Sequence, residues 1–301
     1  MTDRLVDMET LAAIAATGSM AAAGHRLGVS PAVVSRRLAR LEKRLGTRLV
    51  QRTTRSIALT DAGAAFRAHC ARILAEIDDA ETEVARGSAT ASGTLRMTST
   101  VAFGRRLAPL LHRFQAMHPG LRIQLHTSDA LVHLVDDGFD LAVRFGALPD
   151  STLIARQLAP NRRVICASPA YLSRRGRPRT PADLAAHDCI RTGYPPTSEW
   201  RFADGTVVPV AGALASSDGE TAHLWALQGA GLVQKSIWDV HEDLAAGRLE
   251  TVLAAHPLPA VAIHAVYPHR RHSPARLRLC VAYLETELSR AARGLGLDAS
   301  A

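Results

Sequence analysis

The chain has 301 residues, of which 47% are hydrophobic and 21% charged, and its net charge is +8. This composition is typical of a globular protein with a sizeable core, and the length allows two or three domains. No apolar run approaches the roughly 20 residues that a membrane-spanning helix needs, so no membrane partner is expected. The apolar segment after Arg4 contains Asp7 and Glu9, which a signal peptide would lack, and it is interpreted as a buried helix followed by a second helix.

The positive charge is concentrated at the beginning of the chain. Residues 1–61 carry ten basic and five acidic side chains, and hence +5 of the net +8. Such a local excess is typical of a protein that binds a polyanion. A solvated basic surface would show the same excess but would need no ordered geometry, so the helix pattern in this region distinguishes the two interpretations.

Two short helices joined by a glycine-containing turn are predicted here, with the motif over about residues 19–38. Ser19 can cap the first helix, and Gly28 suits the left-handed backbone that ends it. Ser30 and Pro31 can supply the N-cap and the first residue of the second helix. This arrangement is typical of the helix-turn-helix motif of DNA-binding proteins.

The second helix is expected to separate a buried face from a face that meets DNA. The buried face is predicted from residues spaced four, three and four apart, namely Val34, Leu38, Leu41 and Leu45. On the other face, Ala32 and Ala39 are small enough to let the backbone approach base edges. Ser35 can bond a base or a phosphate, and Arg36 can make paired hydrogen bonds with guanine. The residues expected to flank this face and contact the DNA backbone or solvent are Arg37, Arg40 and Arg44.

A short β-hairpin, or wing, is predicted over residues 47–60. Its β-forming ends enclose a polar, basic tip made of Arg52, Thr53, Thr54 and Arg55. A wing beside a recognition helix can reach the DNA backbone or the adjacent minor groove. The alternative is an ordinary surface turn, and the two arginines favour the DNA-binding interpretation.

The run AAAGHRLGVSPAVVSRRLARLEKRLGTRLVQRTTRSIALTDAG resembles the N-terminal domain of LysR-type transcriptional regulators. The resemblance implies that Ala32, Ser35 and Arg36 occupy recognition positions and that Arg55 occupies the wing position. It also implies a homotetramer that binds promoters containing an interrupted inverted repeat in double-stranded DNA. RNA polymerase is a further candidate partner, and the expected location is the bacterial cytoplasm, in association with the nucleoid.

A long helix is predicted over residues 61–87, with Thr60 as its N-cap. Apolar residues spaced alternately four and three apart predict a heptad seam of Phe66, Cys70, Ile73, Ile77, Ala80 and Val84. Charged side chains lie outside this seam, which favours pairing with a second copy of the chain over packing within one domain. A homodimer would present two recognition helices to half-sites about 34 Å apart, or a multiple of that spacing.

Residues 86–93, RGSATASG, predict a linker, and strand–helix alternation follows it. Strands are expected over 94–100, 121–127, 139–146, 162–169 and 259–268, helices over 105–119, 129–138 and 274–292, and a helix, turn and strand over 219–236. Such alternation indicates parallel sheets covered by helices. The pattern resembles the LysR effector domain, in which two Rossmann-like lobes are akin to periplasmic binding proteins. The chain is expected to cross between the lobes near Arg163 and near Tyr267.

The predicted architecture is therefore α/β overall, in four successive parts. These are a winged helix-turn-helix DNA-binding domain (1–60), a dimerisation helix (61–87), a hinge (88–92) and an effector-binding domain (93–295). Within the last part, lobe 1 is expected over about 93–163 and 268–295, and lobe 2 over about 164–267.

A small-molecule site is expected between the lobes, because ligands of open α/β folds bind beyond the carboxyl ends of strands. The candidate residues are Ser99, Thr100, Val101, Arg144, Phe145, Ser216, Ser217 and Lys235. Ser99 and Thr100 precede a helix N-terminus that can attract a carboxylate, and Arg144 can clamp an anion. Helix capping is an equal alternative for the hydroxyls, and Arg144 could instead pair with Asp140 or Asp150. The hypothetical effector is a carboxylate-bearing metabolite.

No enzymatic, metal or cofactor chemistry is predicted. Nucleophile-elbow, zinc-protease, Walker and dinucleotide motifs are missing from the sequence. Its four cysteines are Cys70, Cys166, Cys189 and Cys280, which form no metal-ligand cluster. Reduced thiols are expected, with a redox pair of Cys166 and Cys189 as the alternative. The alternatives to a sequence-specific regulator are a nonspecific architectural DNA-binding protein and a solute-binding enzyme with an added DNA module.

Overall fold

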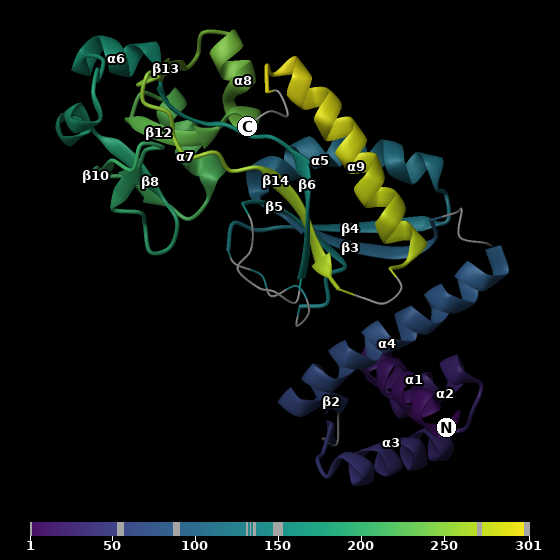
Figure 1. The fold of residues 1–301 in the computed structure, drawn as a ribbon. Coiled ribbons are helices and arrows are strands. Elements are labelled where there is room, and N and C mark those ends of the chain that lie inside the picture. The colour runs from purple at the N-terminus through teal and green to yellow at the C-terminus, as the bar shows by residue number, and fades with distance from the viewer. Residues whose placement is uncertain are drawn as a thin grey trace. The chain divides into compact units, whose positions relative to one another are not determined.

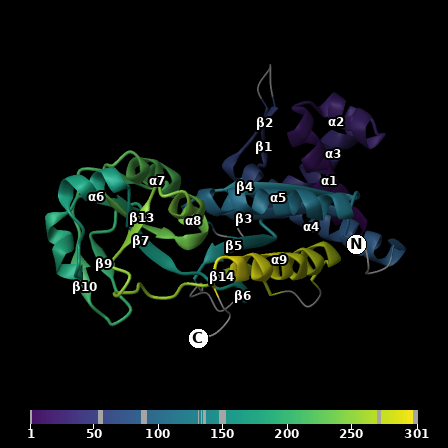
Figure 2. The same cartoon turned by 90° about the horizontal axis from the view of Figure 1, so that it is seen from above.

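A computed structural model describes residues 2–52, 57–86, 91–130, 132, 134, 137–146, 153–269 and 273–297 (Figures 1 and 2). The chain divides into two compact units, Met1–Gly93 and Thr94–Ala301. Each unit has its own core and is described by itself. Within the described ranges, the structure contains no helix that is both long enough and apolar enough to cross a membrane.

The N-terminal unit packs its helices and a hairpin around one small core. Its elements are α1 (Thr2–Thr17), α2 (Met20–Leu27), α3 (Pro31–Leu45), β1 (Val50–Arg52), β2 (Ile57–Leu59) and α4 (Asp61–Arg86). Helix α1 contacts α2, α3 and α4, and the core includes Leu11, Ile14, Val34, Leu38 and Leu41. Strands β1 and β2 pair antiparallel, with Val50 opposite Leu59. The predicted helix-turn-helix and hairpin are therefore confirmed, as are the two helices at the start of the chain.

The helix boundaries follow the capping chemistry that the sequence predicts. The Ser19 side chain accepts a hydrogen bond from the Ala22 amide at the start of α2, and Gly28 ends this helix at φ +66°. The Ser30 side chain accepts one from the Val33 amide at the start of α3, where Pro31 is the first residue. Because the caps satisfy amides that have no partner inside the helix, they fix where each helix begins.

The apolar stripe of α3 ends earlier than its spacing predicts. Val34, Leu38 and Leu41 are buried in the core, whereas Leu45 is 39% exposed. Leu45 is the last residue of the helix, just before Gly46 takes a left-handed conformation, and it lies beyond the core that α1 covers. The prediction that Leu45 is buried is therefore wrong.

The first turns of α4 also belong to the N-terminal core. Cys70 is fully buried, and Phe66 packs against the same cluster, because α1 covers this end of α4. Ile73 is 38% exposed, and the side chains of Ala80 and Val84 lie outside the described ones. The predicted intermolecular seam is thus wrong for Cys70, since a side chain fully buried in one chain cannot pack on another, whereas for the partly buried Phe66 it stays a prediction.

The C-terminal unit contains two lobes, each built on a five-stranded sheet (Figure 1). Lobe 1 comprises β3 (Gly93–Ser99), α5 (Val101–Met117), β4 (Leu121–Thr127), β5 (Leu141–Phe145), β6 (Leu153–Ala159), β14 (Ile263–Pro268) and α9 (Ala275–Gly294). Its strand order is β4-β3-β5-β14-β6. Helices α5 and α9 lie side by side in both views, and the rings of Phe114 and Tyr283 pack between them at 5.2 Å.

Lobe 2 is formed entirely by the middle of the C-terminal unit. It comprises β7 (Arg163–Ala167), α6 (Pro169–Arg175), η1 (Pro181–Ala186), β8 (Cys189–Thr192), β9 (Glu199–Arg201), β10 (Val207–Pro209), β11 (Ala215–Ser216), α7 (Gly219–Leu227), β12 (Leu232–Ser236), α8 (Ile237–Ala245) and β13 (Glu250–Val252). Its large sheet has the order β11-β8-β12-β7-β13, and β9 and β10 form a separate antiparallel pair.

Both large sheets are mixed, so the expectation of purely parallel sheets is wrong. In lobe 1, β3 and β5 are parallel, but β14 runs antiparallel to both β5 and β6. In lobe 2, β12 is parallel to β8 and antiparallel to β7. The physical reason is that β14 enters its sheet from the other lobe and not through a crossover helix, so nothing forces it to run parallel to its neighbours.

The chain crosses between the lobes earlier on its return than the sequence predicts. Strand β13 belongs to the second sheet and β14 to the first, so the return crossing lies within residues 253–262 and not near Tyr267. The outward crossing, at residues 160–162, lies beside Arg163 as expected. Of the predicted helix 129–138, residues 131, 133, 135 and 136 lie outside the described ones, and the others form bends, turns and loop.

Candidate functional site

The exposed face of α3 carries the residues predicted to meet DNA. Ala32 and Arg36 are exposed, and Ser35 is half-buried beside them. The Ser30 cap and Pro31 leave the first amides of α3 at an exposed helix N-terminus, where the helix dipole favours a phosphate. The face therefore combines small residues, a long forked donor and an anion-attracting end.

Lys43 extends this face, although the sequence interpretation did not include it. It lies seven residues after Arg36 and four after Ala39, a spacing that places all three on one side of an α-helix. Lys43 is exposed, on the side opposite the buried Leu41. The same periodicity that revealed the buried stripe could have revealed this second cation.

Arg40 has a structural partner inside the N-terminal unit. Its guanidinium lies 2.5 Å from Asp7 Oδ1, and that of Arg44 lies 3.2 Å from Asp7 Oδ2. Asp7 is fully buried, so the two arginines neutralise a charge that α1 would otherwise bury alone. Contact of Arg40 with DNA stays a prediction, as does contact of the half-buried Arg37.

The wing is attached to α3 through Glu42. Its Oε1 accepts hydrogen bonds from the amides of Leu49 (2.8 Å) and Val50 (3.2 Å) at the start of the hairpin. Arg52 is the last residue of β1, and the tip residues Thr53, Thr54 and Arg55 lie outside the described ones. Glu42 therefore positions the wing beside the recognition helix.

Asp129 joins the two lobes of the C-terminal unit. Its Oδ1 accepts a hydrogen bond of 2.9 Å from the Val101 amide, the first residue of α5 in lobe 1. Its Oδ2 accepts one of 2.8 Å from the Gly219 amide, the first residue of α7 in lobe 2. The N-termini of two helices from different lobes thus converge on one carboxylate.

Two hydroxyls beside this carboxylate have no hydrogen-bond partner among the described residues. Ser99 Oγ, at the end of β3, and Thr100 Oγ1, at the N-cap of α5, are both buried. Thr100 does not cap the helix with its side chain, so the capping alternative fails for this residue. These hydroxyls are therefore buried donors whose hydrogen bonds are not supplied by the described residues.

Arg144 lies beneath the same region, and its hydrogen bonds to the described residues do not include one to Asp140. Its guanidinium donates to the Ser128 carbonyl at 3.1 Å and to Thr98 Oγ1 at 3.4 Å. Asp140 accepts a hydrogen bond from the Arg96 amide, and Asp150 lies outside the described residues. Arg144 is therefore held by neutral oxygens.

Burial lowers the pKa of Arg144, and the negative charge of Asp129 raises it in partial compensation. Asp129 is thus the carboxylate that acts on this guanidinium. Phe145, the next residue of β5, packs its ring edge-on against Phe103 of α5 at 5.3 Å. The aromatic contact packs α5 against the sheet, and contact of Phe145 with an effector stays a prediction.

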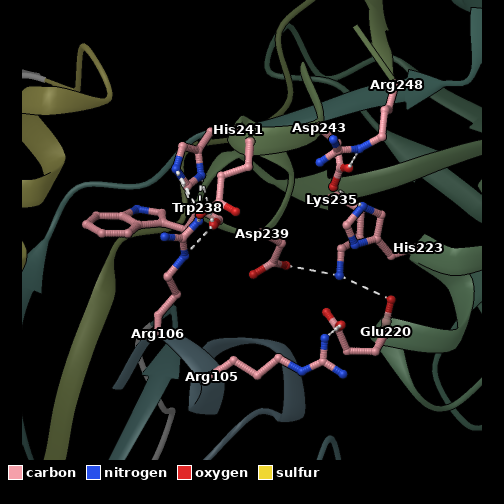
Figure 3. A network of polar contacts seen from close by, with 12 residues as sticks. Arg105, Arg106, Glu220, His223, Lys235, Trp238, Asp239, His241, Asp243 and Arg248 are labelled. Atoms are coloured by element: carbon pink, nitrogen blue, oxygen red, sulfur yellow. Dashed lines mark hydrogen bonds and ion pairs between the residues drawn. The ribbon is translucent and has the colours of Figure 1, made fainter. Parts of the chain in front are cut away.

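Lobe 2 contributes a buried cation and a capped helix to the candidate effector region. Lys235 Nζ lies 3.0 Å from Asp239 Oδ2 and donates to the Gly219 carbonyl at 3.1 Å (Figure 3). Ser216 Oγ accepts a hydrogen bond from the Asp218 amide, and Asp218 caps α7. Asp218, and not Ser216 or Ser217, therefore opens this helix, because its carboxylate accepts hydrogen bonds from the amides of Glu220 and Thr221.

Two consecutive arginines of α5 reach across to lobe 2 (Figure 3). Arg105 pairs with Glu220 at 2.6 Å, and Arg106 pairs with Glu242 at 3.0 Å. Arg106 also donates to the Trp238 carbonyl at 3.1 Å. These contacts connect α5 with both α7 and α8, and the sequence interpretation missed them because they join residues more than a hundred positions apart.

The cysteines are buried, and none forms a disulfide. Burial raises the pKa of Cys70 to about 11 and of Cys166, Cys189 and Cys280 to about 12. Strand β12 lies between the strands of Cys166 and Cys189. Two strand spacings, about 9.6 Å, exceed the reach of a disulfide, so the alternative of a Cys166–Cys189 redox pair is wrong.

Sequence comparisons agree with this two-unit architecture. Residues 5–64 match the family described as "Bacterial regulatory helix-turn-helix protein, lysR family", and residues 88–289 match "LysR substrate binding domain". The chain belongs to the LysR family of transcriptional regulators. It is therefore a DNA-binding regulator with an effector-binding domain, in a family of regulators and not of enzymes.

Individual relatives match along almost the whole chain. The HTH-type transcriptional regulator DmlR of Escherichia coli K12 is 36% identical over 286 residues, which cover 93% of each chain. The HTH-type transcriptional activator TtdR of the same strain is 33% identical, over 92% of this chain and 91% of TtdR. The solved structure of CrgA, a LysR-type regulator from Neisseria meningitidis, matches with a TM-score of 0.62 and 32% identity, over 94% of this chain and 98% of CrgA.

The regulator's candidate residues fall into two regions of known geometry. In the N-terminal unit, the exposed face of α3 brings together Ala32, Ser35, Arg36 and the unpredicted Lys43. In the C-terminal unit, the end of β3, the start of α5 and the start of α7 meet at Asp129, which no motif indicated. Ser217 is exposed beside this region.

Proposed function

We propose that this regulator recognises specific promoter sequences through α3 and the wing, under the control of a small carboxylate effector bound between its lobes. The exposed α3 face carries the DNA-binding part of the proposal, because it places one forked donor among small side chains on a fully capped helix. Such a helix can enter a major groove and read guanine through paired hydrogen bonds.

The proposed DNA contacts divide into base and backbone contacts. Arg36 and Ser35 read bases, and Ala32 lets the helix come close. The proposed phosphate contacts come from the start of α3 and from flanking or wing residues: Ser30, Pro31, Arg37, Arg40, Arg52, Thr53 and Arg55. We add Lys43 to this phosphate-contacting set, because it extends the same exposed face.

The proposed effector site lies where β3, α5 and α7 meet. Two helix N-termini favour an anion, and the hydroxyls of Ser99 and Thr100 offer donors to it. Arg144 and Lys235 add positive charge. A carboxylate fits this donor set better than a cation or an apolar ligand.

The regulator is proposed to act as a homodimer through α4, and further as a homotetramer. The proposed organisation is a DNA-binding domain over 1–60, a dimerisation helix over 61–87, a hinge at 88–92 and an effector domain from 93 to 295. Because it binds DNA, the regulator is proposed to be located in the bacterial cytoplasm, in association with the nucleoid. RNA polymerase is a further proposed partner at the promoter.

Selection of genomic fragments tests the proposal directly. The full-length chain is mixed with sheared bacterial DNA, the retained fragments are sequenced, and binding is repeated with metabolites of the adjacent genes' pathway. The expected result is a few fragments sharing an interrupted inverted repeat, whose affinity changes with one carboxylate. Retention without any preferred sequence would instead support the nonspecific architectural protein, and turnover of a metabolite would support the enzyme.

A further inference from the structure

We propose that Asp129 is an internal ligand of the interlobe site, whose carboxylate occupies the position that a carboxylate effector takes and is displaced when the effector binds. The inference rests on the proposed effector control and deepens it. It assigns a regulatory role to a residue that the sequence interpretation did not include.

The hydrogen bonds of Asp129 are those expected of a bound carboxylate ligand. One oxygen accepts from Val101 at the N-terminus of the 17-residue α5, and the other accepts from Gly219 at the N-terminus of the 9-residue α7. The first amides of a helix have no acceptor within the helix and carry the positive end of its dipole. One side chain thus supplies the anion that both helices favour.

Positive side chains surround the same position. The charge of Asp129 acts on Arg144, which Ser128 and Thr98 hold in place. A Cβ on Gly219 would lie 3.3 Å from Lys235 Nζ and 3.5 Å from Asp129 Oδ2, so both groups border the start of α7. Lys235 already pairs with Asp239, which leaves Asp129 to balance the helix ends and Arg144.

Asp129 leaves part of the donor set at this position unused. The buried hydroxyls of Ser99 and Thr100 have no partner among the described residues, although they adjoin Val101. A free ligand that carries a carboxylate and a second acceptor can bond the helix amides and these hydroxyls together. It therefore has an energetic advantage over the short Asp129 side chain.

The exchange explains how a ligand could act without first bringing the lobes together. Arg105 pairs with Glu220, and Arg106 pairs with Glu242, so α5 keeps contacts with lobe 2 when Asp129 leaves. The effector then replaces the Asp129 bridge between the lobes by its own hydrogen bonds to the two helices, and this new bridge has a different length. Because Asp129 competes for the position, the apparent affinity for the effector is reduced by the fraction of time that Asp129 occupies it.

Chemical rescue by acetate tests this inference, because acetate has the same carboxylate as the aspartate side chain. The full-length Asp129→Ala variant is heated while tryptophan fluorescence is recorded. Trp200, Trp225 and Trp238 all lie in the C-terminal unit, so the signal reports on that unit. The variant is expected to unfold about 2–6 °C below wild type, and acetate should restore the midpoint saturably.

Three comparisons make the result specific. Acetate should shift the unfolding midpoint of wild type no more than sodium chloride of equal ionic strength does. Acetamide should shift the midpoint of neither wild type nor Asp129→Ala. Asp218→Ala removes a carboxylate that also accepts α7 amides but does not bridge the lobes, so acetate should not restore it selectively. Asp129→Ser leaves room for acetate and should respond like Asp129→Ala, which keeps the test available if the alanine variant fails to fold.

The opposite outcomes overturn the inference. Equal acetate responses in wild type and both Asp129 variants, or none in the variants, would show that the position does not bind a free carboxylate. The proposed function fails separately: if acetate rescues Asp129→Ala but no carboxylate metabolite alters DNA binding, the carboxylate-binding position stands, whereas the effector class and the displacement of Asp129 by a carboxylate effector are wrong. Absence of any preferred DNA sequence would likewise leave the acetate result unaffected.

Discussion

At the scale of single residues, the two cations on the exposed face of α3 should have separable roles. Arg36→Ala removes the forked donor, so it should cost about 1–3 kcal/mol against the preferred base and relax discrimination at that position. Lys43→Ala removes a charge that is proposed to contact phosphate and not a base. It should therefore weaken binding to all DNA sequences evenly and reduce the slope of log affinity against log salt concentration by about 1. Titrations of a DNA library at several salt concentrations measure both effects.

The control for these variants is an arginine outside the DNA-binding unit. Arg122 is exposed on β4 and donates to Thr94, so Arg122→Ala should leave DNA binding unchanged. If Arg36→Ala and Lys43→Ala lost discrimination equally, the assignment of base and phosphate contacts on this face would have to be abandoned.

The buried thiols should make stability fall in alkaline solution. Burial raises the pKa of Cys166, Cys189 and Cys280 to about 12 in the folded chain, whereas an exposed thiol ionises near pH 9. The unfolded chain therefore loses these protons first, so the contribution of the thiols to stability is constant below about pH 9 and declines as the pH rises toward 12. Urea unfolding from pH 7 to pH 11 measures this decline.

Alkylation provides a second readout of the same groups. Iodoacetamide at pH 8 should label the thiols in urea-unfolded protein and leave them unlabelled in the native chain, because the thiolate is the nucleophile. Rapid native labelling of Cys166 or Cys189 would contradict the burial on which the alkaline prediction depends.

At the scale of helices and strands, Asp7 should stabilise the packing of α1 against α3. Asp7→Ala leaves Arg40 and Arg44 without their carboxylate, and we expect a loss of about 1–3 kcal/mol, since both arginines are partly exposed to solvent. Glu9→Ala, on an exposed position of the same helix, should cost much less. Hydrogen exchange of the α1 and α3 amides measures the difference, and equal protection in both variants would refute the role of Asp7.

This contact changes how an Arg40 variant is interpreted. Arg40→Ala removes a partner of Asp7 as well as any phosphate contact, so weaker DNA binding by this variant would not by itself locate Arg40 at the DNA. Lys43 is the better probe of the phosphate backbone, because it is exposed and belongs to the face that carries Arg36.

The elements that were predictable from sequence are those determined by neighbouring residues. Ser19, Ser30 and Gly28 fix helix ends through their own side chains or backbone, so the helix-turn-helix followed from local chemistry. Spacing also predicted the apolar stripe of α4, but it could not tell which partner covers the stripe. For Phe66 and Cys70 the partner is α1 of the same chain.

Strand direction was less predictable, because it depends on the path by which the chain enters the sheet. The sequence pattern indicates β14 as a strand, yet its antiparallel pairing with β5 and β6 follows from its arrival out of lobe 2. The loop after β4 was mistaken for a helix in its described part, since a short apolar run does not distinguish the two.

At the scale of the whole molecule, the effector site stays a proposal, and the sequence interpretation of it included hydrogen-bond donors but not the carboxylate of Asp129. Ser99, Thr100 and Val101 were expected to contact an effector because they join a strand end to a helix start. Asp129 was overlooked because a search for an anion site looks for donors, and a carboxylate already in place is an acceptor. Only the folded chain shows that two distant helices share it.

Assembly through α4 should depend on the part of the seam beyond the core. Ile73 is 38% exposed, so Ile73→Glu should weaken pairing of two chains without unfolding the N-terminal unit. Sedimentation should show a shift toward monomer, and binding to a full inverted repeat should fall more than binding to one half-site. His69→Glu, on an exposed position of α4 outside the seam, is the control. An unchanged dimer in Ile73→Glu would place the interface elsewhere.

The packing of Phe66 and Cys70 in the N-terminal core has a mechanical consequence for such an assembly. Because these side chains anchor the start of α4 in the same core as α3, the helix and the DNA-reading surface form one solid piece. A rotation imposed on the far turns of α4 would then turn the recognition helix by the same angle, because the two helices move as one rigid body.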